Sequence, residues 1–146
     1  MSASRLYSYA LVSAQIGCIA FLLQQSYPFF HLLPLSISLF GFVFGIFTLI
    51  TNQPGNFNIV PEIKANASLV TTGAYRYIRH PMYLSVLIMM LGCVIAHTSW
   101  SIALTYVGLG MTLFLKARKE ERLWGTLTPQ YLAYKQRTKY ILPFIL

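Results

Sequence analysis

The sequence predicts an all-α fold: a multi-pass transmembrane helical bundle of about four membrane helices, with a C-terminal cytosolic or interfacial helix. Two observations support this prediction. Hydrophobic residues make up 56% of the 146 residues and charged residues only 10%, whereas a soluble domain has about 25% charged residues. In addition, the sequence has no Asp, Glu, Lys or Arg at residues 6–61 or 81–115. We therefore expect a single integral membrane domain over residues 1–146.

Four apolar segments are the predicted membrane helices, at about residues 6–24, 32–50, 81–97 and 100–116. The first two approach the ~20 residues that span a bilayer, and the polar residues 24–28, which include a proline, separate them. Gly41 and Gly45 form a GxxxG pair, which predicts close packing of the second helix against another. The third and fourth segments are slightly short, so we expect local thinning of the bilayer or tilt of their neighbours.

The distribution of basic residues predicts the orientation. The chain has 11 Lys and Arg against 3 Asp and Glu, a net charge of +8. Such a charge is also typical of nucleic-acid binding, but here the cations flank apolar segments, which favours the lipid bilayer as partner and not nucleic acid. The long loop 51–80 and the segment 117–146 are basic, whereas the other two loops have no Lys or Arg. The positive-inside rule therefore places both termini and the 51–80 loop in the cytosol.

The stretch YRYIRHPMY, residues 75–83, lies where the third predicted membrane helix begins. Pro81 suits the first turn of a helix, and His80 would then be its cap. The positive end of that helix and Arg79 together would attract an anion, while Tyr83, about one turn along, would face the same cavity. The alternative is a simple interface anchor, with a snorkelling arginine and tyrosines in the headgroup region.

A second polar cluster follows the fourth predicted membrane helix. Lys116 and Glu120 are four residues apart and share a helix face, and Glu121 follows directly. Facing the basic stretch 75–83, this cluster would suit a zwitterionic ligand; the alternative is an ordinary surface ion pair. The chain has no Asp, its three histidines are far apart, and it has no phosphate-binding glycine motif, so we expect no metal site and no nucleotide-binding loop of those types.

The segment LVTTGAYRYIRHPMY, followed in the tail by EERL, QYLAYKQR and LPFI, resembles the isoprenylcysteine carboxyl methyltransferases and their prokaryotic relatives. The resemblance covers residues 57–146. RHPxY alone also occurs in phospholipid methyltransferases and some sterol reductases, so the two motifs together give the specificity. The resemblance implies a multi-pass membrane enzyme that uses S-adenosyl-L-methionine.

Carried over by residue, the resemblance implies a pocket in which the 51–80 cofactor loop and the tail meet. The resemblance implies that Lys116 binds the substrate, at a position where the family usually has an arginine. We expect Arg79 to bind the substrate as well. Lysine lacks the planar fork with which arginine grips a carboxylate. Whether Glu62 or Glu121 contacts the cofactor stays open. The cofactor-binding residues are expected to be Ser68, Leu69, Val70, Tyr75, His80, Pro81, Met82, Tyr83 and Glu120.

The expected function is S-adenosylmethionine-dependent methyl transfer to a lipophilic, membrane-borne acceptor, with a prenylcysteine-type or related carboxylate as the first expectation. A carboxylate needs no general base, so no catalytic acid or base is assigned. An amine or thiol acceptor would have to lose a proton, for which His80 and Tyr83 are the nearby candidates. Two alternatives remain: an NADPH-dependent reductase of the sterol type, which needs positive charge for the 2′-phosphate, and a non-catalytic membrane scaffold protein.

Overall fold

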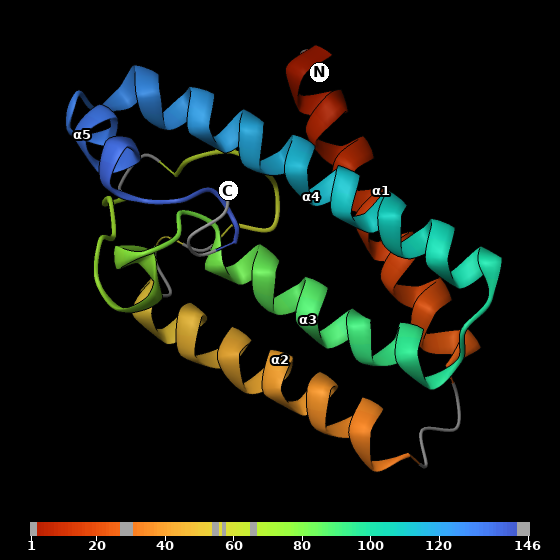
Figure 1. The fold of residues 1–146 in the computed structure, drawn as a ribbon. Helices are drawn as coiled ribbons and strands as arrows, with labels where there is room; N and C mark the ends of the chain where they lie inside the picture. The colour runs from red at the N-terminus through yellow and green to blue at the C-terminus, as the bar shows by residue number, and fades with distance from the viewer. Residues whose placement is uncertain (1–2, 27–30, 54–55, 57, 65–66, 143–146) are drawn as a thin grey trace.

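The computed structural model describes residues 3–26, 31–53, 56, 58–64 and 67–142. These residues form helices and loops without a β-strand, so the predicted all-α fold is confirmed (Figure 1). One isolated bridge pairs Ile78 with Lys139. The elements are α1 (Ala3–Gln25), α2 (Leu32–Thr51), the short 3-10 helix η1 (Gly73–Arg76), α3 (Pro81–Ala96), α4 (Trp100–Leu127) and α5 (Gln130–Arg137).

Three of these helices are long and apolar enough to cross a membrane: α1 with 23 residues, α2 with 20 and α4 with 28. This confirms the helical membrane bundle. The apolar helix α3 has only 16 residues, so its role as a fourth full span stays a prediction. The predicted fourth span ends at residue 116, but α4 continues to Leu127. Its extension is rich in Lys, Arg, Glu and Leu, which are good helix formers, and it places both glutamates of the tail on a rigid helix.

Local sequence signals explain where α3 and α4 begin. Pro81 is the first residue of α3 and His80 occupies the N-cap position, although the imidazole makes no capping hydrogen bond. Proline is favoured there because its missing N–H would have no partner in the helix. At α4, the Ser99 hydroxyl accepts a hydrogen bond from the Ile102 N–H (3.3 Å). Such a cap satisfies one of the free amides of the first turn.

Helices α2 and α3 pack closely along their length, and α1 packs mainly on α4. A side chain at Gly41 would overlap the backbone of Met89, and one at Gly45 would lie 3.1 Å from the Ser85 hydroxyl. The close packing predicted from the GxxxG pair is thus confirmed. Ser38 reinforces it by donating a hydrogen bond to the Met89 carbonyl (2.9 Å). A buried apolar cluster joins α1, α3 and α4, consisting of Leu22, Met90, Cys93, Ile102, Leu109 and Leu113.

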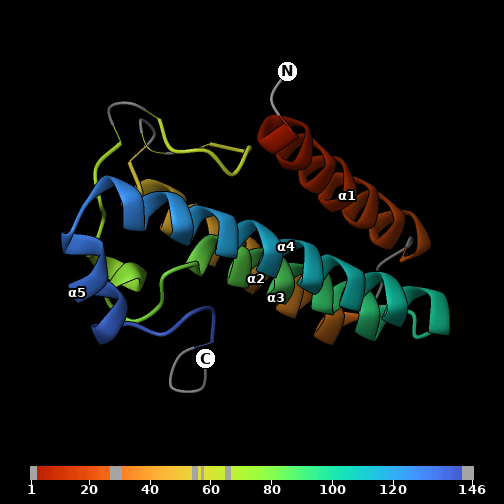
Figure 2. The same ribbon diagram turned by 90° about the horizontal axis from the view of Figure 1, so that it is seen from above.

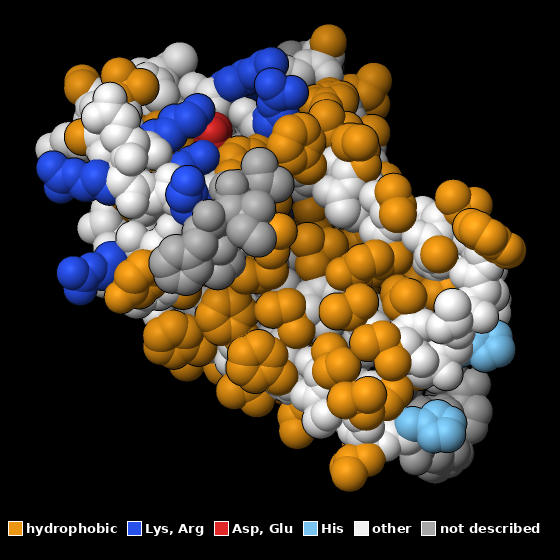
Figure 3. Space-filling model, viewed as in Figure 1, with side chains coloured by type: hydrophobic (Ala, Val, Ile, Leu, Met, Phe, Trp, Pro, Cys, Tyr) orange, Lys and Arg blue, Asp and Glu red, His pale blue; other side chains and the backbone are white. Residues whose placement is uncertain are grey.

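The surface has two regions. Hydrophobic side chains cover most of the visible face, whereas Lys and Arg gather at one end (Figure 3). Large apolar residues such as Leu32 and Trp100 are more than 80% exposed, as expected for helices that face lipid chains. Two views place α5, η1 and the 51–80 loop at the same end of the bundle (Figures 1 and 2). This is the end that contains the candidate site.

Candidate active site

The start of α3 is held against the C-terminal segment by backbone hydrogen bonds. The Lys139 N–H donates to the Tyr77 carbonyl (2.9 Å), the Arg79 N–H to the Lys139 carbonyl (2.9 Å), and the His80 N–H to the Tyr140 carbonyl (3.1 Å). These bonds fix the backbone on which two predicted site residues stand. The stretch 75–83 and the tail therefore meet, as the sequence predicts.

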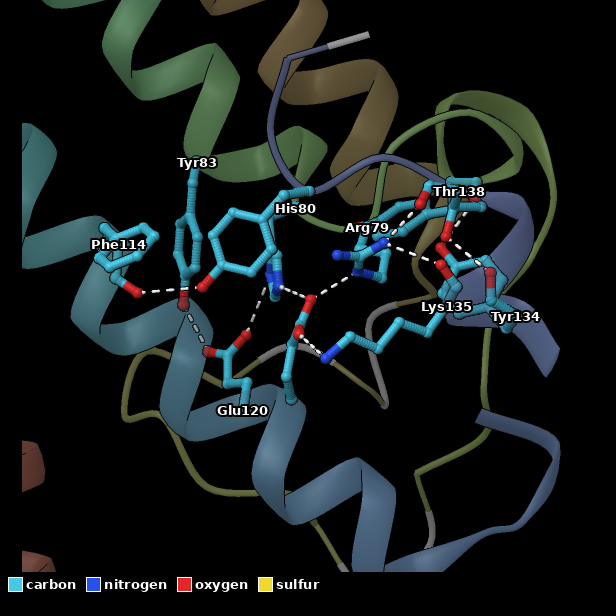
Figure 4. Close-up of polar contacts among 11 residues, drawn as sticks. Arg79, His80, Tyr83, Phe114, Glu120, Tyr134, Lys135 and Thr138 are labelled. Carbon is cyan, nitrogen blue, oxygen red and sulfur yellow. Dashed lines mark hydrogen bonds and ion pairs between the residues drawn. The ribbon is translucent and has the colours of Figure 1, made fainter. Parts of the chain in front are cut away.

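A buried ion pair between Arg79 and Glu121 lies at this junction (Figure 4). Arg79 donates Nε to Glu121 Oε1 and Nη1 to the carbonyls of Lys135 (3.2 Å) and Thr138. Glu121 Oε2 also lies 2.9 Å from Lys135 Nζ. Because buried charges persist only when they are paired, this cluster ties the start of α3 to α4 and α5.

His80, Tyr83 and Glu120 form a second cluster beside the first, in which His80 is buried and the other two residues are half-buried (Figure 4). The Tyr83 hydroxyl donates to Glu120 Oε1, and Glu120 Oε2 lies 3.7 Å from His80 Nδ1. The rings of His80 and Tyr83 stack with centroids 5.5 Å apart. His80 Nε2 lies 3.5 Å from Glu121 Oε1 but makes no hydrogen bond with any described residue. The imidazole thus lies between two carboxylates, with one buried nitrogen unsatisfied.

A cavity opens onto this second cluster. Aromatic residues from three elements form one side of it: Tyr75 of η1, Trp124 of α4, and Tyr131 and Tyr134 of α5. Trp124 and Tyr131 stack with ring centroids 6.3 Å apart. Burial raises the pKa of the Tyr134 phenol. The Arg79 guanidinium lowers this pKa, and the Glu121 carboxylate raises it. That phenol stays protonated and donates to the Tyr75 carbonyl (2.7 Å).

The other side of the cavity comes from the 51–80 loop, whose asparagines hold its shape. Asn56 makes two hydrogen bonds with the backbone of Ser68, accepting from its N–H (2.9 Å) and donating to its carbonyl (3.0 Å). Asn58 donates to the Glu62 carbonyl (3.0 Å). These contacts fold the loop back on itself, so Ser68 and the two residues after it reach the cavity.

Lys116 lies close to Tyr83. Its side chain is 2% exposed, and Nζ donates to Gln15 Oε1 of α1 and to the Ile59 carbonyl (3.0 Å). The ammonium also lies 5.5 Å from the centre of the Tyr83 ring. Four residues further along α4 is Glu120, on the same face as predicted. Lys116 therefore brings a buried positive charge next to the Tyr83–Glu120 pair.

The structure brings most of the predicted residues to one cavity. Pro81 and Lys116 do not line it. Glu62 does, whereas Glu121 does not, because its carboxylate binds Arg79 and Lys135. The predicted residues that line the cavity are Ser68, Leu69, Val70, Tyr75, Arg79, His80, Met82, Tyr83 and Glu120. Sequence reasoning missed Asn52, Asn56, Asn58, Ile63, Ala67, Trp124, Tyr131 and Tyr134 as lining residues.

The fold and the site thus define an apolar helical membrane bundle with a histidine, a tyrosine and a carboxylate gathered beside a cavity at one end. The model of the isoprenylcysteine carboxyl methyltransferase (ICMT) family matches residues 32–124, more than half of the chain. The chain belongs to this family. Membership implies methyltransferase activity on a membrane-borne substrate, and members generally use S-adenosylmethionine. Comparison with curated proteins gives no match.

Proposed function

We propose that this protein transfers a methyl group from S-adenosylmethionine to a lipophilic acceptor carboxylate, with a prenylcysteine-type carboxylate as the first candidate. The observation that supports this best is the cluster of the buried His80 with the half-buried Tyr83 and Glu120. It opens onto a cavity at one end of an apolar helical bundle. There a water-soluble donor and a lipid-borne acceptor can approach from different sides.

The lining residues fit such a cofactor chemically. The Glu120 carboxylate, which lines the cavity, suits the ammonium group or the ribose hydroxyls. Tyr75 and Trp124 offer flat surfaces for an adenine ring. The cavity has a volume of about 140 Å³, less than the roughly 300–1,000 Å³ of typical small-molecule sites. A bound cofactor would therefore extend beyond the enclosed part of this cavity.

The chain's own residues have two tasks in this reaction. When bound, S-adenosylmethionine supplies an electrophilic methyl group on a sulfonium. An acceptor carboxylate is already a nucleophile, so no side chain has to remove a proton. Lys116 beside Tyr83 and Arg79 beside Glu121 provide positive potential for that carboxylate. The apolar surroundings exclude water, which strengthens these interactions, and the helices hold the acceptor in line.

The same proposal includes the orientation. We propose that both termini and the active site face the cytosol. Lys and Arg gather at the site end of the molecule, and the histidine side chains on the visible face lie at the other end (Figure 3). Basic residues stay on the cytosolic side during insertion. Labelling of His97→Cys and Arg137→Cys, each made in a protein with Cys18→Ala and Cys93→Ala, with a membrane-impermeant reagent tests this: only His97→Cys should react from the outside.

Calorimetric titration of the detergent-purified protein with S-adenosylhomocysteine tests the cofactor. We expect binding by the wild type and a loss of at least tenfold in affinity in His80→Ala and in Glu120→Gln, since each removes a polar group from the cavity. Arg122→Ala is the matched control, because this exposed residue lies on the same helix but does not line the cavity. Its affinity should equal that of the wild type.

The same titration separates the competing functions. NADPH binding in place of S-adenosylhomocysteine would establish a reductase, and binding of neither ligand by folded protein would favour a scaffold. Transfer of a labelled methyl group to farnesylated cysteine, compared with its methyl ester, then tests the carboxylate acceptor. The ester has no free carboxylate and should stay unlabelled.

A further inference from the structure

A groove lies on the other side of the segment that forms one wall of the cavity. It has a volume of about 630 Å³ and runs between the end of α2, η1 and the start of α3. Phe44 and Phe47 of α2 and Leu84 of α3 give it apolar walls, and Arg76 and Tyr77 lie at its edge. A groove of this size is within the range of small-molecule sites.

The groove and the cavity are separate sites. Among the described residues, none lines both. Along residues 74–79 the chain alternates between them: Tyr75 and Arg79 line the cavity, whereas Arg76, Tyr77 and Ile78 line the groove. A molecule in the groove is therefore separated from the active site by the backbone of this segment. Its occupant is not the methyl acceptor.

Arg76 sets the charge of the expected occupant. Its side chain is exposed and makes no hydrogen bond or ion pair with any residue that the structure describes. The three acids of the sequence lie elsewhere: Glu62 and Glu120 line the cavity and Glu121 is paired. Arg76 is therefore left free among the described residues to pair with an anion of another molecule.

The position of the groove relative to the membrane indicates what kind of molecule it can bind. Phe44 and Phe47 belong to a helix apolar enough to cross the membrane, whereas Arg76 lies beyond the end of that helix. Tyr77, which is 58% exposed, is the type of residue found at the headgroup level. An occupant thus needs an apolar chain at the level of the phenylalanines and an anion at the level of Arg76. Anionic phospholipids have this arrangement.

We propose that the groove binds one anionic phospholipid, with its phosphate against Arg76 and an acyl chain along Phe44 and Phe47. The guanidinium forms charge-assisted hydrogen bonds with phosphate oxygens. The phenyl rings contact the acyl chain over the length of the groove. The proposal does not depend on the enzymatic function, because neither the donor nor the acceptor of the methyl group occupies this site.

Native mass spectrometry of the detergent-solubilised protein, titrated with phosphatidylglycerol or phosphatidylcholine, tests the proposal. We expect the wild type to bind one phosphatidylglycerol more tightly than phosphatidylcholine. Arg76→Gln should weaken phosphatidylglycerol binding about fivefold, since one basic residue near an anionic headgroup has about that effect, and should leave phosphatidylcholine binding unchanged. Phe47→Ala should weaken the binding of both lipids.

Arg137→Gln is the control, because this exposed arginine lies on α5 and does not line the groove. It should bind phosphatidylglycerol like the wild type, and all variants should keep the wild-type unfolding midpoint. Equal losses in Arg76→Gln and Arg137→Gln would overturn the proposal in favour of diffuse attraction to the basic end. Equal affinity of the wild type for the two lipids would also overturn it. So would a dimer that dissociates in Phe47→Ala, because a second chain would then occupy the groove.

Discussion

Replacing Glu121 with glutamine removes the negative charge from the junction of α3, α4 and the C-terminal segment. The side chains of Arg79 and Glu121 are 9% and 8% exposed. Removing one partner of a buried ion pair costs about 3–5 kcal/mol, because it leaves an uncompensated buried charge. Arg79 keeps its hydrogen bonds to the carbonyls of Lys135 and Thr138. We therefore expect the lower value, a loss of about 3 kcal/mol in the free energy of unfolding.

Thermal unfolding in detergent micelles measures this loss, which corresponds to a fall in Tm on the order of 10 °C for a chain of this size. Lys135→Gln is the matched variant, because it removes the half-exposed cation that binds the same carboxylate. It should cost no more than about 1 kcal/mol. The double variant Arg79→Met/Glu121→Leu replaces both charges with apolar groups and should be more stable than Glu121→Gln.

The result that refutes this reasoning is a Glu121→Gln protein as stable as Lys135→Gln. Glu121 would then contribute only as a surface carboxylate. A double variant less stable than Glu121→Gln would also contradict it, since the loss would then come from hydrogen bonds and packing and not from an unpaired charge.

Three further contacts can be tested by thermal unfolding of variants. Gly41→Ala should lose about 1–3 kcal/mol because the new methyl group overlaps α3. Gly17→Ala has open space around it and should be neutral or slightly stabilising; equal effects of the two variants would disprove the close packing. Tyr134→Phe should lose about 1–3 kcal/mol because it leaves the buried Tyr75 carbonyl unpaired, and an unchanged midpoint would argue against that bond. Gln15→Leu should lose a similar free energy of unfolding, because it removes a hydrogen-bond acceptor from the buried Lys116 ammonium. Gln15→Glu keeps an acceptor there and should restore stability. Failure of Gln15→Glu to do so would contradict the Gln15–Lys116 contact.

The membrane bundle and the start of α3 could be predicted from the sequence because their causes are local. Charge-free segments of about membrane length form helices in lipid, and the position of Pro81 fixes where α3 begins. The placement of the tail beside residues 75–83 followed from the charges of the loops. Each of these features depends on residue types and charges that can be seen directly in the sequence, so no three-dimensional structure is needed to predict it.

The role of Glu121 could not be predicted: the sequence assigns Glu120 to the cofactor side and leaves open whether Glu121 contacts the cofactor. Successive residues on a helix point about 100° apart, so one carboxylate faces the cavity and the other faces Arg79. Which one does so depends on the rotation of α4 against α3, a tertiary property. The Gln15–Lys116 contact was missed for another reason: Ser4, Ser8 and Gln15 form a polar stripe at helical spacing, a signal that was present in the sequence but not used.

Residues 74–79 lie between the cavity and the groove and contribute side chains to both. Tyr75 and Arg79 face the cavity while Arg76 and Tyr77 face the groove, so a movement of this short segment changes both. Its backbone is held at one end by Lys139 and at the other by Gly73, whose φ of +57° and contact with Thr51 leave little room for a side chain. A bound phospholipid would hold the segment from the lipid side. If both proposals hold, the affinity for S-adenosylhomocysteine should rise with phosphatidylglycerol in the wild type but not in Arg76→Gln, because a segment already ordered by the lipid costs less to order when the second ligand binds.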